Sequence, residues 1–291
     1  MELERQRTTG RLDLRYEDVA QDGRVQLETM PVALGVIWRA LMVDKTTRRA
    51  LRDAGIVPIL TRFEIEGTAG PFSVDRPLEI EGGYALGHVA DAEGRVSRLL
   101  LVMDGELWGP KGRTNLPPPE DAGTRALVGR VRAEHVFTRP FAPAEERKVL
   151  ALPFGGGGFV PSERLEWRPP TSTLDPPSGA RPLEGKLRDD PVETVIGLSH
   201  TDSNQHVNSL VYPRLFEDAA LRRMAELGRP TAVLARKLDI AFRRPTFAGE
   251  VLRLSLQAFE QGGRVVCVGV FFGPETRDPL RARVYAQMTF E

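Results

Sequence analysis

The sequence concentrates polar side chains in one short segment, HTDSNQHVNSLVYPRLFE, at residues 200–217. Within it, Asp202, Asn204, His206 and Asn208 stand at every second position. In an extended or turn segment, this spacing allows side chains to converge. A carboxylate and an imidazole are the groups that move protons in hydrolysis, and amide side chains can orient a reacting group. The segment therefore predicts a site for acyl-transfer hydrolysis.

A helix should follow this polar segment. Pro213 lacks an amide hydrogen and is tolerated only in the first turn of a helix. We therefore expect the helix to begin near residues 210–212 and to end near Leu227, with residues 202–208 as its lead-in. Free backbone amides at a helix start can polarise a carbonyl. The amides of residues 208–210 are candidates to stabilise an oxyanion.

Each of these polar residues also has an ordinary structural explanation. Asp202 could cap a turn, which is a common use of aspartate before a helix. His206 could be a packed or a surface histidine, and Asn204 and Asn208 could be turn residues. Composition alone leaves both explanations open.

The bulk composition limits the classes of protein that fit this chain. Hydrophobic residues make up 41% and charged residues 27% of 291 positions, which predicts neither a disordered nor a membrane protein. Lys+Arg and Asp+Glu are equal at 40 each, so a nucleic-acid partner is not indicated. No apolar run approaches about 18 residues, and the N-terminus lacks the apolar core of a signal peptide. We expect a cytoplasmic protein.

The single cysteine, Cys267, excludes an internal disulfide framework and a cysteine-based zinc site. It lies in the strand-like run RVVCVGVFF, and we interpret it as a small buried apolar side chain, with a catalytic thiol as the alternative. The glycines at 155–158 are not followed by the Lys-Ser/Thr of a phosphate-binding loop. We expect neither a metal nor a cofactor.

The predicted elements occur in the same order twice. In the first half, short strands at 11–16 and 24–29 precede a helix at 32–54, which Gly55 closes. In the second half, short strands at 164–168 and 192–198 precede the helix described above. Strands follow each helix, at 56–67, 77–90, 95–108 and 126–137, and again at 232–243, 250–260, 264–272 and 280–290. The repetition indicates an internal duplication.

A long helix wrapped by an antiparallel sheet is the hot-dog arrangement, so the predicted fold class is α+β, a double hot dog of two tandem repeats. We assign residues 1–140 to an N-terminal hot-dog domain, 141–190 to a linker with Gly- and Pro-rich loops, and 191–291 to a C-terminal hot-dog domain that carries the motif. Residues 163–168 are an alternative source of the last domain's first strand. A partner sheet closes the open edge of each single sheet. Because the duplication could supply this partner internally, we expect a monomer or a homodimer.

The run DSNQHVNSLVY resembles the signature of acyl-ACP thioesterases, which reads Asp-x-Asn-x-His-Val-Asn-Asn and then a tyrosine. Asp202, Asn204, His206, Asn208 and Tyr212 all fall on this pattern without a gap. Serine stands in place of the second asparagine. The continuation YPRLFEDA is similar to the wider thioesterase superfamily, in which Tyr-x-x-x-Phe-Glu is frequent.

This resemblance implies a thioester hydrolase that acts on acyl-ACP or acyl-CoA and releases the free acid. As a hypothesis, Asp202 is the nucleophile or the general base, His206 orients water or protonates the leaving thiolate, and Asn204 positions the carbonyl or the water. Substrate-binding residues are then Asn208, Ser209, Tyr212, Glu217, Arg243 and Arg244. Arg236 and Lys237 are alternatives to the two arginines.

The resemblance also assigns the acyl pocket to the N-terminal hot dog. Its helix offers apolar candidates for the pocket wall, namely Val36, Ile37, Trp38 and Leu41. Ordinary packing of the helix core is the alternative explanation for these side chains.

The sequence departs from the family pattern on the next strand. There the family carries Tyr-Arg-Arg and then Glu-Cys, whereas Phe242-Arg243-Arg244 is followed here by Pro245-Thr246. The expected glutamate is absent, and neither Asp239 nor Glu250 can be assigned to its role from sequence.

Two other classes of function fit the same fold. The signature of hot-dog hydratases resembles Asp-x-Asn-Pro-x-His, in which the His stands five positions after the Asp. In this chain the separation is four positions, and the proline is absent. The spacing favours the thioesterase. Two alternatives remain. One is a dehydratase or acyltransferase of a biosynthetic pathway, and the other is a noncatalytic acyl-thioester-binding protein.

Overall fold

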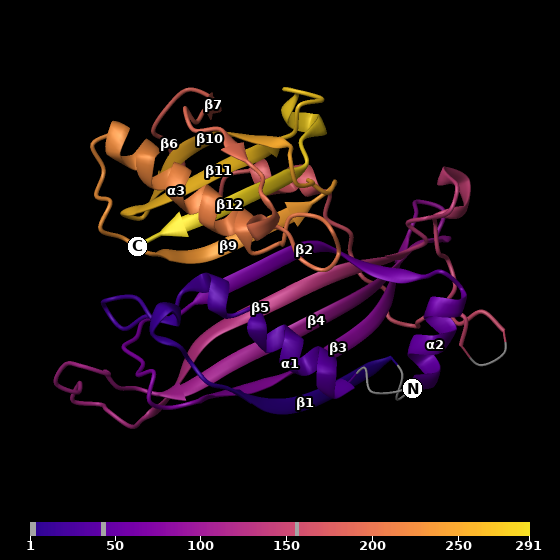
Figure 1. Ribbon diagram of the computed structural model, residues 1–291, viewed down its shortest axis with the longest axis horizontal. Helices are drawn as coiled ribbons and strands as arrows, with labels where there is room; N and C mark the ends of the chain where they lie inside the picture. Colours follow the sequence, from indigo (N-terminus) through magenta and orange to yellow (C-terminus); the bar gives the residue numbers. More distant parts are fainter. Residues whose placement is uncertain (1–3, 42–44, 155–156) are drawn as a thin grey trace. The chain divides into compact units, whose positions relative to one another are not determined.

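The computed structural model describes residues 4–41, 45–154 and 157–291. The chain folds into two compact units. Unit 1 comprises Met1–Val25, Thr29–Phe63 and Thr68–Arg168, and unit 2 comprises Gln26–Glu28, Glu64–Gly67 and Pro169–Glu291. Each unit combines an antiparallel sheet with helix, which confirms the α+β class (Figure 1).

Unit 1 is built around an antiparallel sheet with the strand order β1-β3-β4-β5-β2. Its strands are β1 (Arg5–Leu12), β2 (Val57–Gly67), β3 (Leu78–Ala90), β4 (Val96–Pro110) and β5 (Arg125–Thr138). Helix α1 (Val32–Leu41) lies against one face, and α2 (Lys45–Asp53) follows it in the chain. The helix approaches the sheet so closely that any side chain at Gly82 would collide with Ile37 Cδ1.

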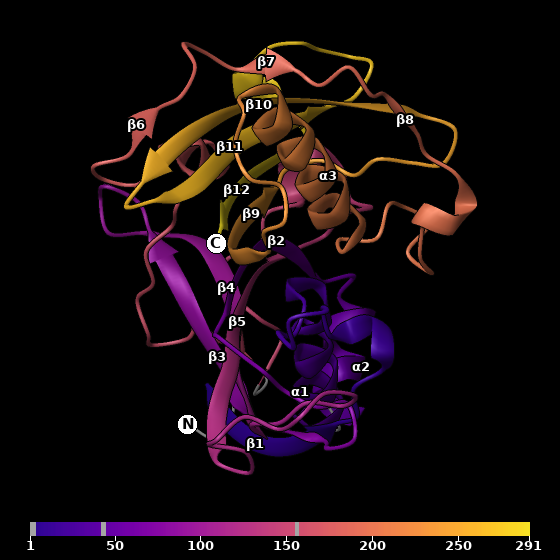
Figure 2. The ribbon, with the colours of Figure 1, turned by 90° about the vertical axis from the view of Figure 1, so that its left-hand side faces the viewer.

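Unit 2 has the strand order β9-β12-β11-β10. These strands are β9 (Ala235–Phe242), β10 (Val251–Gln261), β11 (Arg264–Phe272) and β12 (Val284–Phe290), and helix α3 (Val211–Glu226) crosses one face of their sheet (Figure 2). The Phe216 ring of α3 is fully buried, with its centroid 6.2 Å from that of Phe271 on β11. Cys267 is buried in this core, and burial raises the pKa of its thiol to about 12, as expected of a structural side chain.

The predicted linker is an ordered part of unit 2 from residue 169 onward. Its 3₁₀ turn η4 (Pro170–Leu174) packs Leu174 against a buried cluster that includes Val270 and Phe272. Three short strands then pair with β10: β6 (Arg181–Pro182), β7 (Arg188–Asp189) and β8 (Thr194–Val195). Glu184 contacts the buried Arg223 of α3 at 2.6 Å.

Several predicted elements differ in the structure. The first strand is β1 rather than residues 11–16, and residues 24–29 hold the 3₁₀ turn η2 (Leu27–Thr29). The polar run RQRTTGRL forms a strand because its backbone pairs with β3, and its weak apolar alternation gave no signal of this. The predicted helix 32–54 is α1 and α2, with residues 42–44 outside the described chain.

Residues 163–168 form no strand of unit 2. Instead, Arg164 makes an isolated parallel bridge with His88 of β3, inside unit 1. The predicted strand 192–198 contracts to β8 and is followed by the 3₁₀ turn η5 (Leu198–His200). The remaining 3₁₀ turns in the described chain are η1 (Tyr16–Asp18), η3 (Ala144–Glu146) and η6 (Pro279–Arg281). None of the helices in the described ranges is long and apolar enough to cross a membrane.

Candidate active site

The predicted lead-in is a tight turn that starts at Asp202. The Asn204 amide donates to Asp202 Oδ1 at 2.8 Å, and the Gln205 amide donates to the Asp202 carbonyl at 2.9 Å. Gln205 takes a positive φ of 65°, a conformation that costs a non-glycine residue about 1–2 kcal/mol. The Asp202 amide then donates to the His206 carbonyl at 3.2 Å. The turn thus brings Asp202 and His206 side by side at its base.

Asn208 connects this turn to helix α3. Its Nδ2 donates to Asp202 Oδ2 at 3.1 Å, and its Oδ1 accepts from the Leu210 amide at 2.8 Å. Both oxygens of the Asp202 carboxylate therefore accept a hydrogen bond from the loop. Asp202 does cap a turn, as the alternative explanation held, and the same contacts fix the direction of its carboxylate.

Helix α3 begins where the sequence predicts. Val211 is its first residue, so Pro213 falls in the first turn, where a missing amide hydrogen leaves no bond unmade. Gly228 ends it with a φ of 64°. The motif therefore stays non-helical up to Ser209 and Leu210, and its polar side chains are held by loop hydrogen bonds.

The two histidines of the segment are fixed in opposite tautomers. His206 Nδ1 lies 3.1 Å from the Val207 carbonyl oxygen, which can only accept, so Nδ1 carries a proton and Nε2 of the neutral ring has the free lone pair. His200 Nδ1 instead accepts from the Gly197 amide at 3.0 Å. A base with its lone pair on Nε2 is the form suited to accept a proton from water, and His206 has this form.

The backbone amides expected to hold an oxyanion are partly occupied. The Asn208 amide donates to the His200 carbonyl at 2.9 Å, and the Leu210 amide is bonded to the Asn208 side chain. Among the residues that the structure describes, the Ser209 amide makes no hydrogen bond. The predicted set of three amides is therefore corrected to one, because the His200 carbonyl occupies the Asn208 amide and Asn208 Oδ1 occupies the Leu210 amide.

Tyr212 is a structural residue in this geometry. It is 3% exposed, and its hydroxyl donates to Thr246 Oγ1 at 3.0 Å, while its ring lies edge-on to Phe271 at 5.3 Å. Burial raises the pKa of the hydroxyl. The Val207 amide donates to the Thr246 carbonyl at 2.8 Å. Thr246 thus ties the Asp202–Asn208 loop to helix α3, and sequence reasoning singled out Tyr212 but missed this partner.

Glu217 lies one turn further along α3 and is half-buried. The pKa of its carboxyl is raised to about 7. Burial is the largest cause, and the negative charges of Glu28 and Asp218 add to it. A glutamate here is therefore able to change its charge near neutral pH.

The glutamate that the family pattern expects is not supplied by Glu250. Both of its oxygens contact the Arg283 guanidinium, at 2.5 and 3.0 Å, and one also accepts from the Phe247 amide at 2.8 Å. The Arg283 hydrogen bonds lower the pKa of Glu250. Glu250 therefore secures the loop before β10. Asp239 lies on β9, opposite Gln287 in the register, and stays unassigned.

The predicted basic residues are exposed on the loop that follows β9. Arg243 donates to the Leu280 carbonyl at 2.6 Å, while the Arg244 backbone amide donates to the Arg283 carbonyl at 3.2 Å. Of the alternatives, Arg236 pairs with Glu291 at 3.9 Å, and Lys237 is exposed on β9.

In unit 1, the residues predicted to line an acyl pocket behave differently from one another. Ile37 is fully buried against the sheet, as the core explanation expects, and the Leu41 side chain lies outside the described residues. The Trp38 ring lies 6.5 Å from that of His135 on β5. Among the described residues, the buried Nδ1 of His135 has no hydrogen-bond partner, and burial lowers the pKa of the imidazole to about 4. Nothing in the sequence pattern singled out this histidine.

Comparisons with known proteins concern the fold and one part of unit 2. Residues 204–277 match a family model described as "Thioesterase superfamily". No curated protein matches the sequence. Among the described chain segments, no group of three or more His, Cys, Asp or Glu side chains could hold a metal ion.

Three solved structures match over almost the whole chain. A protein described as an oleoyl thioesterase from Lactobacillus plantarum is 12% identical, with a TM-score of 0.62 over 98% of this chain and 96% of its own. A 12:0-ACP thioesterase from Umbellularia californica is also 12% identical, with a TM-score of 0.58 over 98% and 97%. An acyl-ACP thioesterase from Bacteroides thetaiotaomicron is 14% identical, with a TM-score of 0.56 over 98% of both chains.

These likenesses confirm the double hot-dog fold. The family match covers the part of unit 2 that holds the His206 turn, α3 and β9–β11. Together with the Asp202–His206 motif, this match supports a thioester hydrolase within a double hot-dog fold.

Proposed function

We propose that the chain hydrolyses fatty-acyl thioesters carried on an acyl carrier protein, with coenzyme A thioesters as the alternative substrate, and releases the free acid. One observation carries the chemical part of this proposal. Asn208 binds the Asp202 carboxylate with its amide nitrogen and the start of α3 with its amide oxygen. The proton-accepting group and the helix start are thereby held in one fixed geometry.

The proposed reaction adds water across the thioester. Asp202 is the nucleophile or the general base toward a water, and His206 Nε2 accepts or returns the proton that the leaving thiolate needs. The Ser209 amide donates to the carbonyl oxygen as negative charge develops on it, a contribution commonly worth about 3 kcal/mol. Asn204, exposed at the tip of the turn, positions the carbonyl or the water. The products are a carboxylic acid and a free thiol.

The surface near the motif supports a protein carrier. Arg243, Arg244 and Arg281 are exposed there, and exposed apolar side chains lie among them, namely Leu198, Phe247 and Leu280. An acidic carrier would be steered by such a basic face, and apolar contacts would hold it. Two of the matching structures are named as ACP thioesterases, which supports the same choice.

Release of free thiol from matched acyl-ACP and acyl-CoA substrates tests the chemistry. The Asp202→Asn variant should lose at least about 100-fold in kcat, because it lacks the proton acceptor. Asp13→Asn, the same change at an exposed position of unit 1, should keep full activity. Unchanged turnover in folded Asp202→Asn protein would reject the mechanism, and acyl binding without thiol release would indicate a noncatalytic acyl-binding protein.

The carrier is tested with the same two substrates. In the Arg243→Glu/Arg244→Glu double variant, KM for acyl-ACP should rise about tenfold or more at low salt. The difference from the wild type should shrink as the salt concentration rises, because ions screen charge steering. KM for acyl-CoA should change less. Equal effects on both substrates would mean that the arginines contact the phosphates of the shared pantetheine arm instead.

A further inference from the structure

The face of the unit 1 sheet that faces away from α1 is covered by paired charges. Arg5, Arg7, Arg125, Arg130 and Arg132 each contact a carboxylate within 3.3 Å. Arg130 of β5 pairs with Glu106 on the neighbouring strand β4, whereas Arg7 of β1 reaches across β3 to Asp104 of β4. Opposite charges that meet on one face of a sheet stabilise that face.

Two arginines at one end of this face break the pattern. Arg98 on β4 and Arg164 on the segment after β5 have no carboxylate within contact distance among the described residues. Arg98 is also half-buried, and burial without a compensating partner lowers the pKa of its guanidinium. The guanidinium carbon of Arg98 lies 4.2 Å from the centroid of the Trp167 ring, a cation–π contact.

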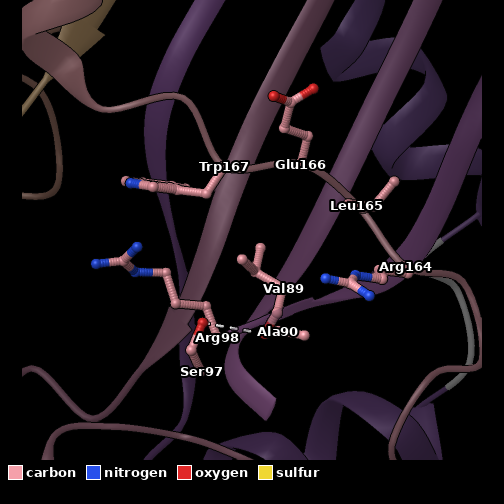
Figure 3. Close-up of a pocket in the computed structure, with 8 residues that line it drawn as sticks. All are labelled: Val89, Ala90, Ser97, Arg98, Arg164, Leu165, Glu166 and Trp167. Carbon is pink, nitrogen blue, oxygen red and sulfur yellow. Dashed lines mark hydrogen bonds between the residues drawn. The ribbon is translucent and has the colours of Figure 1, made fainter. Parts of the chain in front are cut away.

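These residues line a cavity of about 570 Å³. Val89, Leu165 and Trp167 supply an apolar wall, which continues the buried cluster formed by Leu100 and Val102. Figure 3 shows the Arg98 guanidinium beside the Trp167 ring and the Glu166 carboxylate directed away from both arginines. The one acidic side chain of the wall therefore leaves the two positive charges unneutralised.

The cavity wall is held in place before any ligand binds. The segment 163–167 is hydrogen-bonded along β3, through the His88 amide to the Glu163 carbonyl and the Leu165 amide to the His88 carbonyl, both at 2.8 Å. His88 Nδ1 donates to the Pro161 carbonyl at 2.8 Å. Any side chain at Gly87 would collide with Leu165 Cδ1, so the segment packs directly on the strand. This open pocket is lined in about equal parts by polar and apolar side chains, so it suits a small ligand that carries both kinds of group.

We propose that this cavity binds a small organic oxyanion with an apolar body, at a site separate from the Asp202 motif and independent of the proposed hydrolysis. The anionic group pairs with the guanidinium donors of Arg98, which match a carboxylate or a phosphate, and Arg164 adds a second positive charge to the same lining. The apolar body covers Val89, Leu165 and Trp167. A free carboxylic acid and an alkyl phosphate share this chemistry, and the experiment distinguishes between them.

Calorimetric titration of the full chain tests the site with four probes of equal chain length: octanoate, octyl phosphate, octanol and octylamine. Octanoate or octyl phosphate should bind with saturation, and the tighter of the two identifies the anionic group. Octanol and octylamine should bind at least tenfold more weakly, because one lacks the charge and the other reverses it. Equal affinity for octanoate and octanol would overturn the proposal.

Variants locate the binding. Arg98→Gln and Trp167→Leu should each lower the affinity for the anionic probe at least tenfold. Arg130 lies on the same face and is paired with Glu106, so Arg130→Gln should leave this affinity unchanged. Octanoate could also occupy the hydrolytic site as a product, so the titrations are repeated in Asp202→Asn protein. Binding that persists in Arg98→Gln overturns the proposal. Thiol release by Arg98→Gln should equal that of the wild type, so the result stands apart from that of the proposed function.

Discussion

Asn208 Nδ2 donates a hydrogen bond to Asp202 Oδ2 at 3.1 Å, while the same side chain accepts one from the Leu210 amide. One amide side chain therefore sets both the direction of the carboxylate and the point where α3 begins. The family pattern shows this asparagine only as part of a motif. In the structure, its side chain joins the Asp202 carboxylate to the start of α3.

Replacing Asn208 with alanine should lower kcat about tenfold or more without unfolding the chain, because Asp202 loses one of its two donors. The matched control is Ser203→Ala in the same turn, whose exposed side chain forms no hydrogen bond in the described structure. Steady-state thiol release measures both variants. A rise in KM with an unchanged kcat would show that Asn208 binds substrate rather than positions Asp202.

The two histidines of the segment should differ sharply in importance. His206→Gln removes the Nε2 lone pair and should cost about 100-fold in kcat, in line with the loss of a general base or acid. His200→Gln should reduce activity far less, since His200 Nδ1 is used by the Gly197 amide. If the two variants lose activity equally, His206 is not the proton-transfer group.

Glu217 should make the protein less stable as the pH rises. The pKa of its carboxyl is about 7 in the folded chain and 4.5 ordinarily, so between these values the unfolded chain has released a proton that the folded chain retains. The free energy of unfolding therefore falls as the pH rises from about 4.5 through about 7.

A Glu217→Gln variant checks this effect. It should melt at a higher temperature than the wild type at pH 8, and the difference should shrink toward pH 5. Melting followed by circular dichroism at both values measures it. A variant that is less stable than the wild type at pH 8 would show that the ionised carboxylate is favourable in place.

His135 should act in the opposite direction, at acid pH. Burial lowers the pKa of its imidazole to about 4 from 6.5, so below 6.5 the unfolded chain binds a proton that the folded chain does not bind until about 4. Stability is therefore lost as the pH falls through this window. His135→Leu should remove this part of the acid sensitivity, which unfolding in denaturant at pH 7 and pH 5 would measure. Parallel losses in both proteins would contradict the assignment.

Tyr212→Phe should destabilise unit 2 by about 1 kcal/mol, the usual net value of a hydrogen bond. The change removes the bond to Thr246 Oγ1 and keeps the aromatic contacts with Phe242 and Phe271. Denaturant unfolding measures the loss. Combining it with Thr246→Val should add little further cost if the two hydroxyls act as one pair.

Local sequence signals were sufficient for much of the fold. The alternation of apolar residues predicted most strand bounds. Glycines predicted helix ends, and the position of Pro213 predicted the start of α3. Each of these signals depends on nearest-neighbour backbone chemistry. The polar strand β1 was missed, and the predicted strand 164–168 was given to the second repeat although it bridges to β3. Both segments take their conformation from pairing with β3, which is distant in the sequence.

For the site, the sequence by itself determined which residue types stand at which spacing, and so the fold and the general class of activity. Tertiary structure decided their contacts. Two of the three expected amides are occupied, Glu250 pairs with Arg283, and Tyr212 is buried against Thr246. Among the described residues, no carboxylate contacts Arg98 or Arg164. The reason is physical: hydrogen bonds and ion pairs depend on the distance and direction between groups that meet in space, and spacing along the chain does not contain that information.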